Sequence, residues 1–238
     1  MQENLKGKVA IITGASAGIG RSVSLALAAE GVRCVLAARR ANELSEVCRE
    51  IEKAGGEALV VPTDVTHEGQ IQTLVAKTLE HFGDLHILIN NAGVYQRGRV
   101  EQLEKEKILH TLNINLISHM LVTKYCLPHL KGKKGAAVIN MASMAGLMGF
   151  ADGSVYSASK HALIGFSESL YEEVREEGIK VCAICPGFVR TPMVAKTPLK
   201  QENMIPPEDV AQMVVNVLKL SGNSCPTRIV IRPQYSVY

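Results

Sequence analysis

The pattern of hydrophobic and polar positions alternates between two periods along the chain. Short apolar and β-branched runs, typical of strands, lie at 9–13, 34–38, 58–61, 85–90, 136–141, 180–185 and 228–231. Longer amphipathic stretches predict helices at 19–30, 41–54, 67–82, 104–129, 155–177 and 207–220. This alternation predicts an α/β fold, a Rossmann-type doubly wound sheet of about seven parallel strands with helices on both faces.

Continuous apolar strands indicate a sheet that is buried on both faces, and such a sheet suggests where ligands bind. The run Ile87-Leu88-Ile89 is continuously apolar, whereas a strand with one face in water would alternate polar and apolar residues. In an open parallel sheet buried on both faces, ligands bind beyond the carboxyl ends of the strands, where the strand order reverses. The stretch 187–206, with three prolines and little periodicity, predicts a long loop of the kind that closes over a substrate.

Length and composition fit one domain. The 238 residues, 47% hydrophobic and 21% charged, suit a single α/β domain spanning 1–238. The polar first residues lack a secretory pattern, and no apolar run reaches the ~18–20 residues of a membrane span. We therefore expect a cytoplasmic protein with no membrane partner.

Charged and metal-binding residue types give no sign of a second function. The formal charge of +3 is dispersed, and the one short basic run, 131–134, is typical of a solvated turn, so no nucleic-acid partner is expected. Cys182 and Cys185 fall in a predicted strand, where residues an odd number apart face opposite sides. The histidines, including His81 and His86, show no ligand spacing, so we expect no metal.

A glycine-rich segment follows the first predicted strand and leads into a helix. It reads Thr13-Gly14-Ala15-Ser16-Ala17-Gly18-Ile19-Gly20. Glycines permit a tight turn and a close backbone approach, and the helix N-terminus offers free N–H groups to a pyrophosphate. The position at the first strand-to-helix turn favours a dinucleotide site over a simple linking turn. The expected cofactor contacts are Gly14, Ser16, Gly18, Ile19 and Gly20.

The residues after the second strand indicate which cofactor is used. NAD-specific folds usually place Asp or Glu there, whereas a 2′-phosphate requires arginine. Here Ala37-Ala38 is followed by Arg39 and Arg40, without a carboxylate. Charge-assisted, bidentate contacts from these residues favour NADP(H). The alternative is that both arginines cap the sheet edge and face solvent.

Polar residues follow the later strands at the same sheet edge. Tyr156 and Lys160 stand at i and i+4 of a predicted helix and share one face, although that pair alone is more typical of a helix surface than of a site. Ser143 follows the fifth strand. The motifs Asn90-Asn91-Ala92-Gly93 and Pro186-Gly187 follow the fourth and sixth strands. All of these groups are therefore expected at one edge.

Together these motifs resemble the short-chain dehydrogenase/reductase family over nearly the whole chain, from Lys8 to the last strand. Further motifs that carry the resemblance are Asp64-Val65, Asn115, Tyr156-Ser157-Ala158-Ser159-Lys160, and Thr191 after Pro186-Gly187. The resemblance implies an NADP(H)-dependent enzyme that reduces a carbonyl to an alcohol, or the reverse, on a small-molecule substrate.

The resemblance also implies roles for single residues. Tyr156 donates or accepts the proton, and Lys160 holds the nicotinamide ribose and lowers the pKa of the tyrosine from its free value of ~10. Ser143 bonds the reacting oxygen, and Asn115 supports a water that relays protons from Lys160. The cofactor contacts expected beyond the glycine-rich loop are Arg39, Arg40, Asp64, Val65, Asn91, Ala92, Gly93, Tyr156, Lys160, Pro186, Gly187, Val189 and Thr191.

The substrate and the assembly stay open. The segment 143–150, with Met193 and Met204, is as consistent with an apolar pocket as with core packing. One alternative is a 3-oxoacyl-[acyl-carrier-protein] reductase, although those enzymes usually end in a Gly-rich stretch rather than in residues like 232–238 here. The acidic run Glu172, Glu173, Glu176 and Glu177 would also repel an acidic carrier.

Two alternatives come from other functional classes. One is a non-catalytic, cofactor-binding regulator, against which the intact Ser143, Tyr156 and Lys160 argue. The other is an epimerase or lyase that uses the same tyrosine without net oxidation. The predicted helices 104–129 and 155–177 lie where members of the family pair, which implies a homodimer or homotetramer.

Overall fold

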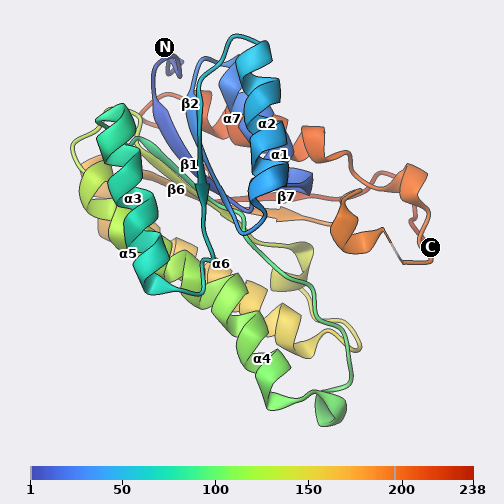
Figure 1. Ribbon diagram of the computed structural model, residues 1–238. Coiled ribbons are helices and arrows are strands. Elements are labelled where there is room, and N and C mark those ends of the chain that lie inside the picture. The colour runs from blue at the N-terminus through green and yellow to red at the C-terminus, as the bar shows by residue number, and fades with distance from the viewer. Residues whose placement is uncertain (1, 196) are drawn as a thin grey trace.

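The computed structural model describes residues 2–195 and 197–238, and its centre is one sheet of seven strands (Figure 1). The strands are β1 (Val9–Thr13), β2 (Arg33–Ala38), β3 (Ala58–Pro62), β4 (Ile87–Asn90), β5 (Ala137–Met141), β6 (Lys180–Pro186) and β7 (Arg228–Ile231). Their order across the sheet is β3-β2-β1-β4-β5-β6-β7, and all neighbouring pairs are parallel. The predicted Rossmann-type fold is confirmed.

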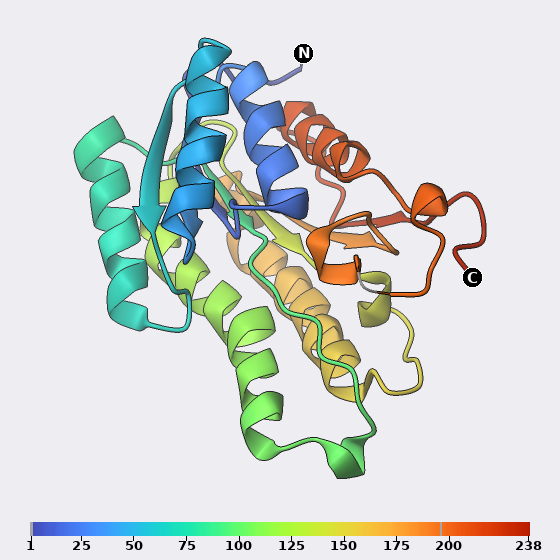
Figure 2. The same cartoon turned by 45° about the vertical axis from the view of Figure 1, so that its right-hand side comes forward.

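Helices cover both faces of the sheet. They are α1 (Gly18–Ala29), α2 (Ala41–Lys53), α3 (Glu68–Phe82), α4 (Lys105–Leu112), α5 (Ser118–Leu130), α6 (Ser154–Val174) and α7 (Pro207–Lys219). Helices α1, α2 and α7 pack on one face, and α3, α5 and α6 on the other (Figures 1 and 2). Within the described ranges, no helix is both long and apolar enough to cross a membrane.

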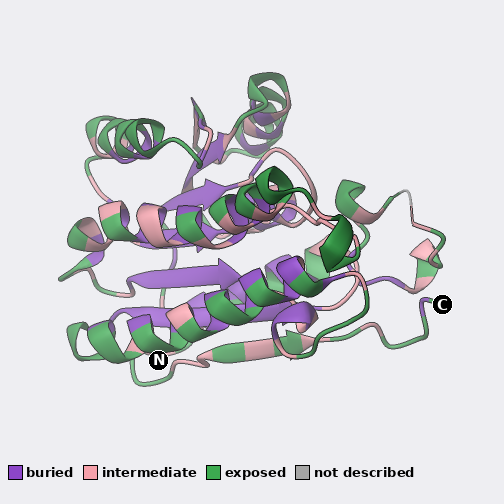
Figure 3. Cartoon of the chain, turned by 90° about the horizontal axis from the view of Figure 1, so that it is seen from below, coloured by how far each residue is buried: buried purple, intermediate pink, exposed green. Residues whose placement is uncertain are grey.

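Strand β1 shows why the central strands are continuously apolar. Ala10 and Ile12 face one helix layer, whereas Val9 and Ile11 face the other, and all four are fully buried. Successive side chains of a strand point to opposite faces, so a polar residue at any of these positions would lie inside a helix–sheet interface. Burying one such isoleucine stabilises the fold by about 1.5–3 kcal/mol relative to exposing it. Figure 3 shows the buried strands between the helix layers, with β7 partly exposed at the edge.

Two long helices differ in detail from the sequence prediction. The segment predicted as one helix, 104–129, consists of α4 and α5 joined by a π-helical turn, Asn113–Ile117. The segment 155–177 consists of α6 followed by a 3₁₀ turn, Arg175–Glu177. A pattern of apolar residues follows the course of a helix, but it does not report one turn of altered hydrogen bonding. Single π turns are frequent at functional sites, and Asn115 lies within this one.

The strand order reverses between β1 and β4, and this reversal positions the ligand site. From β1 the chain adds β2 and β3 on one side, and β4 to β7 then follow on the other. The loops after β1 and β4 therefore part at the carboxyl edge and open a crevice. The predicted long loop 187–206 contains two 3₁₀ turns, Pro192–Val194 and Gln201–Asn203, and a β-bridge between Val189 and Ile205.

Candidate active site

A cavity of about 680 Å³ opens at the carboxyl edge of the sheet. Loops that follow β1 to β6 line it, and its volume is typical of small-molecule sites. Every site residue expected from the sequence lines this cavity except Gly20 and Asn115. Both exceptions are buried. One edge of the sheet thus collects the residues that the sequence assigns to cofactor and catalysis.

The glycine-rich loop has no room for side chains at two positions. A Cβ on Gly14, whose φ is +67°, would lie 2.8 Å from Asn91 Nδ2. A Cβ on Gly20 would lie 2.3 Å from the carbonyl oxygen of Gly14, so the start of α1 packs directly against the turn after β1. No described side chain caps the N-terminus of α1. Its first N–H groups are therefore available to an anion.

Thr13 joins the turn after β1 to the loop after β4. Its Oγ1 accepts hydrogen bonds from the N–H groups of Asn91 and Ala92, at 2.9 and 3.1 Å. The side-chain amide of Asn91 donates in return to the carbonyl oxygen of Thr13, at 2.9 Å. These bonds hold the two sides of the crevice in register. The only sequence signal for Thr13 is a hydroxyl at the end of an otherwise apolar strand.

Two arginines stand at the end of β2, and both line the cavity while also reaching solvent. Arg40 Nη2 donates to Ser16 Oγ at 3.0 Å, and Arg40 Nη1 pairs with Glu43 Oε1 at 3.3 Å. Arg39 forms no ion pair with a described carboxylate. Burial acts to raise the pKa of Asp64, but hydrogen bonds from Thr66 and the charge of Arg39 lower it overall. From the sequence, a cofactor contact and a solvent-facing position are alternatives for these two arginines. In the structure both arginines line the cavity and are also exposed to solvent.

Ser143, Tyr156 and Lys160 converge on the cavity. Tyr156 and Lys160 lie one turn apart on α6, with Lys160 Nζ 6.0 Å from the centre of the Tyr156 ring. Lys160 Nζ donates to the carbonyl oxygen of Met141, at the end of β5, at 2.7 Å. Ser143 follows β5, and its Oγ accepts from the N–H of Ala145 at 3.1 Å.

The pKa of the tyrosine departs from the expectation. Burial raises the pKa of Tyr156, and hydrogen bonding from Ser143 offsets only part of that rise. The expected lowering by Lys160 is wrong for this structure, because the Lys160 ammonium bonds the carbonyl of Met141 instead of the phenol. Burial also lowers the pKa of Lys160 to about 8, so this lysine holds its proton less firmly than an exposed one.

Asn115 joins the loop after β4 to α6. Its Oδ1 accepts from the N–H of Val94 at 2.8 Å, and its Nδ2 donates to the Val94 carbonyl at 2.9 Å and to Ser159 Oγ at 3.2 Å. The side chain is thus engaged by Val94 and Ser159 rather than by Lys160. Its role in a proton relay stays a prediction.

A buried histidine lies beneath the same loop. His119 Nε2 is 2.7 Å from the carbonyl oxygen of Ala92, which makes Nε2 the protonated nitrogen. Its Nδ1 has no hydrogen-bond partner among the described residues. Burial, reinforced by the charge of Lys160, lowers the pKa of His119 to about 3, so this side chain is neutral in the folded protein. A lone histidine in an amphipathic helix gives no sequence signal of this position.

Four aromatic residues outside the sequence motifs also line the cavity: Tyr95, Phe150, Phe188 and Tyr238. Phe150 belongs to the segment 143–150, which the sequence offered as a pocket candidate, and Phe188 to the predicted loop 187–206. Tyr95 follows β4, so the rule that locates the polar motifs after each strand would have found it. Of the two interpretations left open for the methionines, Met193 fits the pocket because it lines the cavity, whereas Met204 is buried outside the lining and fits core packing.

The doubly wound parallel sheet, with its glycine-rich turn after the first strand, defines a Rossmann-type α/β protein. A sequence model of the short chain dehydrogenase family matches residues 8–202. The chain belongs to this family of oxidoreductases.

Individual relatives agree with that assignment. The ketoacyl reductase HetN of Nostoc sp. is 34% identical over 219 residues, which are 90% of this chain and 76% of that protein. A metagenomic short-chain oxidoreductase solved in complex with NADP has a TM-score of 0.87 and 32% identity, over 98% of this chain and 100% of that one. An alcohol dehydrogenase from the archaeon Thermococcus sibiricus, complexed with 5-hydroxy-NADP, has a TM-score of 0.90 and 28% identity, over 96% and 97%.

Proposed function

We propose that this chain is an NADP(H)-dependent oxidoreductase that interconverts a carbonyl and an alcohol by hydride transfer, with Tyr156 as general acid and base. The observation that carries the proposal is the convergence of Ser143, Tyr156 and Lys160 on the cavity that also holds the glycine-rich loop. The NADP complexes of two structural relatives support the choice of cofactor.

The residues of the cavity fit a nicotinamide dinucleotide phosphate. The uncapped start of α1 and the close approach at Gly14 suit a pyrophosphate. Arg39 and Arg40 supply two cations for a 2′-phosphate at the end of β2. A Cβ on Gly93 would lie 3.9 Å from Lys160 Nζ, so this glycine keeps the approach to the lysine open for the nicotinamide ribose. The resemblance assigns Asp64 and Val65 to the adenine, and Asn91 and Thr191 to the ribose and the nicotinamide amide.

The side chains around the reacting carbon have separate roles in the reaction. When bound, the nicotinamide supplies or accepts the hydride. The Tyr156 hydroxyl donates a proton to the carbonyl oxygen of the substrate, and in the reverse direction it takes the proton from the alcohol. The Ser143 hydroxyl holds the same oxygen, and the Lys160 ammonium would hold the nicotinamide ribose. Because burial raises the pKa of Tyr156, the phenol keeps its proton at neutral pH, which suits a donor for carbonyl reduction.

The test is the consumption of NADPH by the purified chain with a panel of ketones, diketones and 3-oxoacyl thioesters. Tyr156→Phe should lower turnover by ~10² or more and leave NADPH affinity within a few-fold, because only the hydroxyl is lost. The matched control, Tyr171→Phe, changes a tyrosine of the same helix outside the cavity lining and should change neither. A Tyr156→Phe enzyme with full turnover would remove this residue from the mechanism.

Results without net oxidation would favour the other functional classes. Binding of NADPH without consumption of the cofactor on any substrate points to a regulator. Conversion of a substrate at constant NADPH points to an epimerase or lyase. We also propose a homodimer or homotetramer, which light scattering on the purified chain tests directly.

A second candidate is reduction of 3-oxoacyl groups carried on an acyl carrier protein. The similarity to the ketoacyl reductase HetN favours it. Against it stands the acidic end of α6, where Glu172 and Glu176 already surround Arg175 at 3.2 and 3.3 Å. An acidic carrier would meet repulsion there. A kcat/KM for an acetoacetyl carrier protein far above that for every free ketone would establish this function instead.

A further inference from the structure

Aromatic side chains are concentrated in the cavity. The chain has four Phe, six Tyr and no Trp, and five of these ten line the cavity. Of these, Phe150 and Tyr238 are 43% and 79% exposed, and Met148 and Met193 beside them are 57% and 49% exposed. Single exposed apolar residues are ordinary on a protein surface, but a group of them around one cavity indicates a surface that receives an apolar ligand.

Tyr95 and Phe150 form the first wall of this apolar part of the cavity. Their rings are stacked, with 6.5 Å between centroids and 25° between planes. Tyr95 also meets the ring of Tyr156 edge-on, at 5.1 Å and 89°. The aromatic wall thus reaches the tyrosine that we assign as proton donor, so a ligand against the wall has its reacting carbon next to that hydroxyl.

The backbone of the loop that carries Phe150 is held in a rare conformation. Asp152 has φ +62°, which residues other than glycine seldom adopt. Its carbonyl oxygen accepts from Gly98 N at 2.8 Å, and its carboxylate lies 3.4 Å from Arg97 Nη2. A Cβ on Gly153 would lie 2.1 Å from the Phe150 ring, so the ring folds over this glycine and would have to shift if the position carried a side chain. Strain secured by such contacts is typical of ligand-binding surfaces.

Phe188 and Tyr238 form the second wall. Their rings meet edge-on, at 6.2 Å and 88°. The chain before Tyr238 is fixed to the 200–203 turn, because the buried Val237 accepts from the N–H of Lys200 at 2.9 Å (Figure 2). All four residues of the two walls line the same cavity, so a ligand held there can meet both walls.

Formal charge is confined to the nucleotide end and the catalytic lysine. Among the side chains of the described lining residues, only those of Arg39, Arg40, Asp64 and Lys160 carry one. The arginine nearest the first wall, Arg97, is paired with Asp152 and lies outside the lining. A phosphate or carboxylate between the two walls would therefore lose its hydration without gaining a described cationic partner.

We infer that the substrate is a neutral carbonyl compound, or its alcohol, that carries a planar aromatic ring next to the reacting carbon, and that Tyr95, Phe150 and Tyr238 select it. The inference rests on the proposed function and adds the substrate class. A flat ring makes offset and edge-on contacts with these side chains that an alkyl chain of equal size cannot make. An alkyl chain also loses more conformational freedom when it is ordered.

Three ethyl ketones with equal numbers of carbon atoms test the inference: propiophenone, cyclohexyl ethyl ketone and the open-chain nonan-3-one. Acetoacetyl-CoA serves as the charged thioester. We expect kcat/KM with NADPH to be highest for propiophenone, by about ten-fold over the open-chain ketone, which corresponds to one or two aromatic contacts. Phe150→Leu and Tyr238→Leu, from opposite walls, should each reduce this ratio several-fold. Tyr235→Leu is the control, because Tyr235 is exposed and lies outside the lining.

The outcomes separate the inference from the function on which it rests. Equal kcat/KM for the three ketones, a preference for acetoacetyl-CoA, or an unchanged ratio in both wall variants would overturn the aromatic substrate class while the oxidoreductase function stands. Reduction of none of the four compounds, with NADPH still bound in a fluorescence titration, would overturn the aromatic substrate class, and the wider panel of ketones, diketones and thioesters then decides the oxidoreductase function. Turnover of the open-chain ketone by the wall variants shows that they are folded.

Discussion

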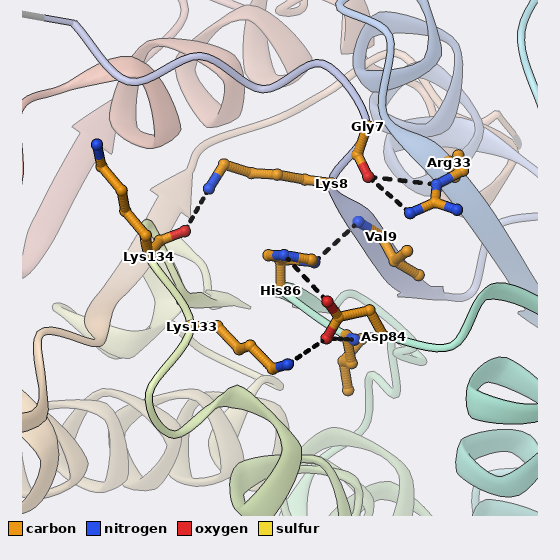
Figure 4. Close-up of polar contacts among 9 residues, drawn as sticks. Gly7, Lys8, Val9, Arg33, Asp84, His86, Lys133 and Lys134 are labelled. Atoms are coloured by element: carbon orange, nitrogen blue, oxygen red, sulfur yellow. Dashed lines mark hydrogen bonds and ion pairs between the residues drawn. The ribbon is translucent and has the colours of Figure 1, made fainter.

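The two edges of the sheet carry similar charged side chains and use them in opposite ways. At the amino edge, Lys8 donates to the carbonyl of Lys134, and Arg33 Nη2 donates to the carbonyl of Gly7 at 2.8 Å (Figure 4). These cations serve neighbouring backbone groups of the protein itself.

Asp84 completes the arrangement at that edge. Its two carboxylate oxygens lie 2.8 Å from Lys133 Nζ and 3.6 Å from His86 Nε2 (Figure 4). The other ring nitrogen of His86 accepts from the N–H of Val9 at 3.3 Å. The polar groups of the amino edge are thus paired within the fold and leave little for a ligand.

The carboxyl edge has the same residue types with part of their bonding capacity left over. Lys160 donates to a carbonyl as Lys8 does, but it also lines the cavity. Arg39 meets no carboxylate within ion-pair distance in the described chain, and it lines the same cavity. A charged residue type therefore does not mark a site. Unused bonding capacity at a cavity does.

The largest difference between the two edges is expected when the buried lysine of each edge is replaced. Lys160→Met should lower kcat/KM by ~10²–10³ and also weaken NADPH binding, because it removes the cation one turn from Tyr156 and the proposed ribose contact together. Lys8→Met removes an equivalent bond to a carbonyl at the other edge and should leave kcat/KM within a few-fold. Steady-state kinetics with urea unfolding of each variant makes the measurement. Equal losses of activity would mean that both lysines act through the fold.

The next largest effect concerns the arginines. Arg39→Gln should weaken NADPH by roughly ten-fold to a hundred-fold and leave NADH almost unchanged, because hydrogen bonds to charged groups contribute ~1.5–3 kcal/mol. Adding Ala38→Asp should shift the preference toward NADH, since a carboxylate repels the phosphate and accepts from a free 2′-hydroxyl. Arg33→Gln, the amino-edge control, should change neither dissociation constant in a nicotinamide fluorescence titration. Equal weakening of both cofactors by Arg39→Gln would contradict a phosphate contact.

Acid should lower the stability of the fold through one histidine at each edge of the sheet, His119 and His86. Burial lowers the pKa of both His119 and His86, and Asp84 partly opposes the shift at His86. Below about pH 6.5 the unfolded chain binds a proton that the folded chain does not bind. The free energy of unfolding therefore falls as the pH drops below that value. At His119 the loss continues to about pH 3, by up to about 1.4 kcal/mol per pH unit.

The acid effect is measured by urea unfolding across this pH range. His119→Gln should flatten the pH dependence of the unfolding free energy, whereas His110→Gln, on the exposed surface of α4, should leave it unchanged. Identical slopes in the wild type and in His119→Gln would show that another group controls acid stability.

The smallest effect is expected at the amino-edge carboxylate. Asp84→Asn removes an ion pair whose two side chains are 30% and 39% exposed, so the free energy of unfolding should fall by less than about 1 kcal/mol. Turnover and NADPH affinity should stay at wild-type values. A loss of activity in this variant would mean that the amino edge takes part in function.

Much of the fold and most of the polar site follow from local patterns. Burial on both faces leaves continuous apolar runs, and these runs locate all seven strands to within two residues at each end. The prediction for β4 begins early because Leu85 is buried like a strand residue although it precedes the ladder. The glycine-rich turn and the polar groups after the strands gather at one edge because parallel strands end together.

The remaining features depend on three-dimensional contacts that no local pattern records. The pKa of Tyr156 depends on where Lys160 directs its ammonium, and that direction is set by the carbonyl of Met141. The ring of Phe150 reaches Tyr95 because Gly153 lacks a side chain and Asp152 turns the backbone. Residues 236–238 join the cavity through bonds to a turn some thirty positions earlier in the chain, such as Asn203 Nδ2 to the Ser236 carbonyl.

The reversal of strand order between β1 and β4 also divides the site residues between two consecutive parts of the chain. The chain up to α3 supplies the glycine-rich loop, the arginines and Asp64, and the chain from β4 onward supplies Ser143, Tyr156, Lys160 and both aromatic walls. Because the proposed 2′-phosphate contacts lie in the first part and the proposed substrate contacts in the second, we expect a recombination between α3 and β4 to change the cofactor preference and to keep the substrate preference. At the site, the two parts of such a chimaera would meet at the bonds of Thr13 with Asn91 and Ala92, at the bond from Asn91 to the Gly14 carbonyl, and where Thr191 packs against Gly18. Two selective pressures can therefore act on two consecutive stretches of one gene.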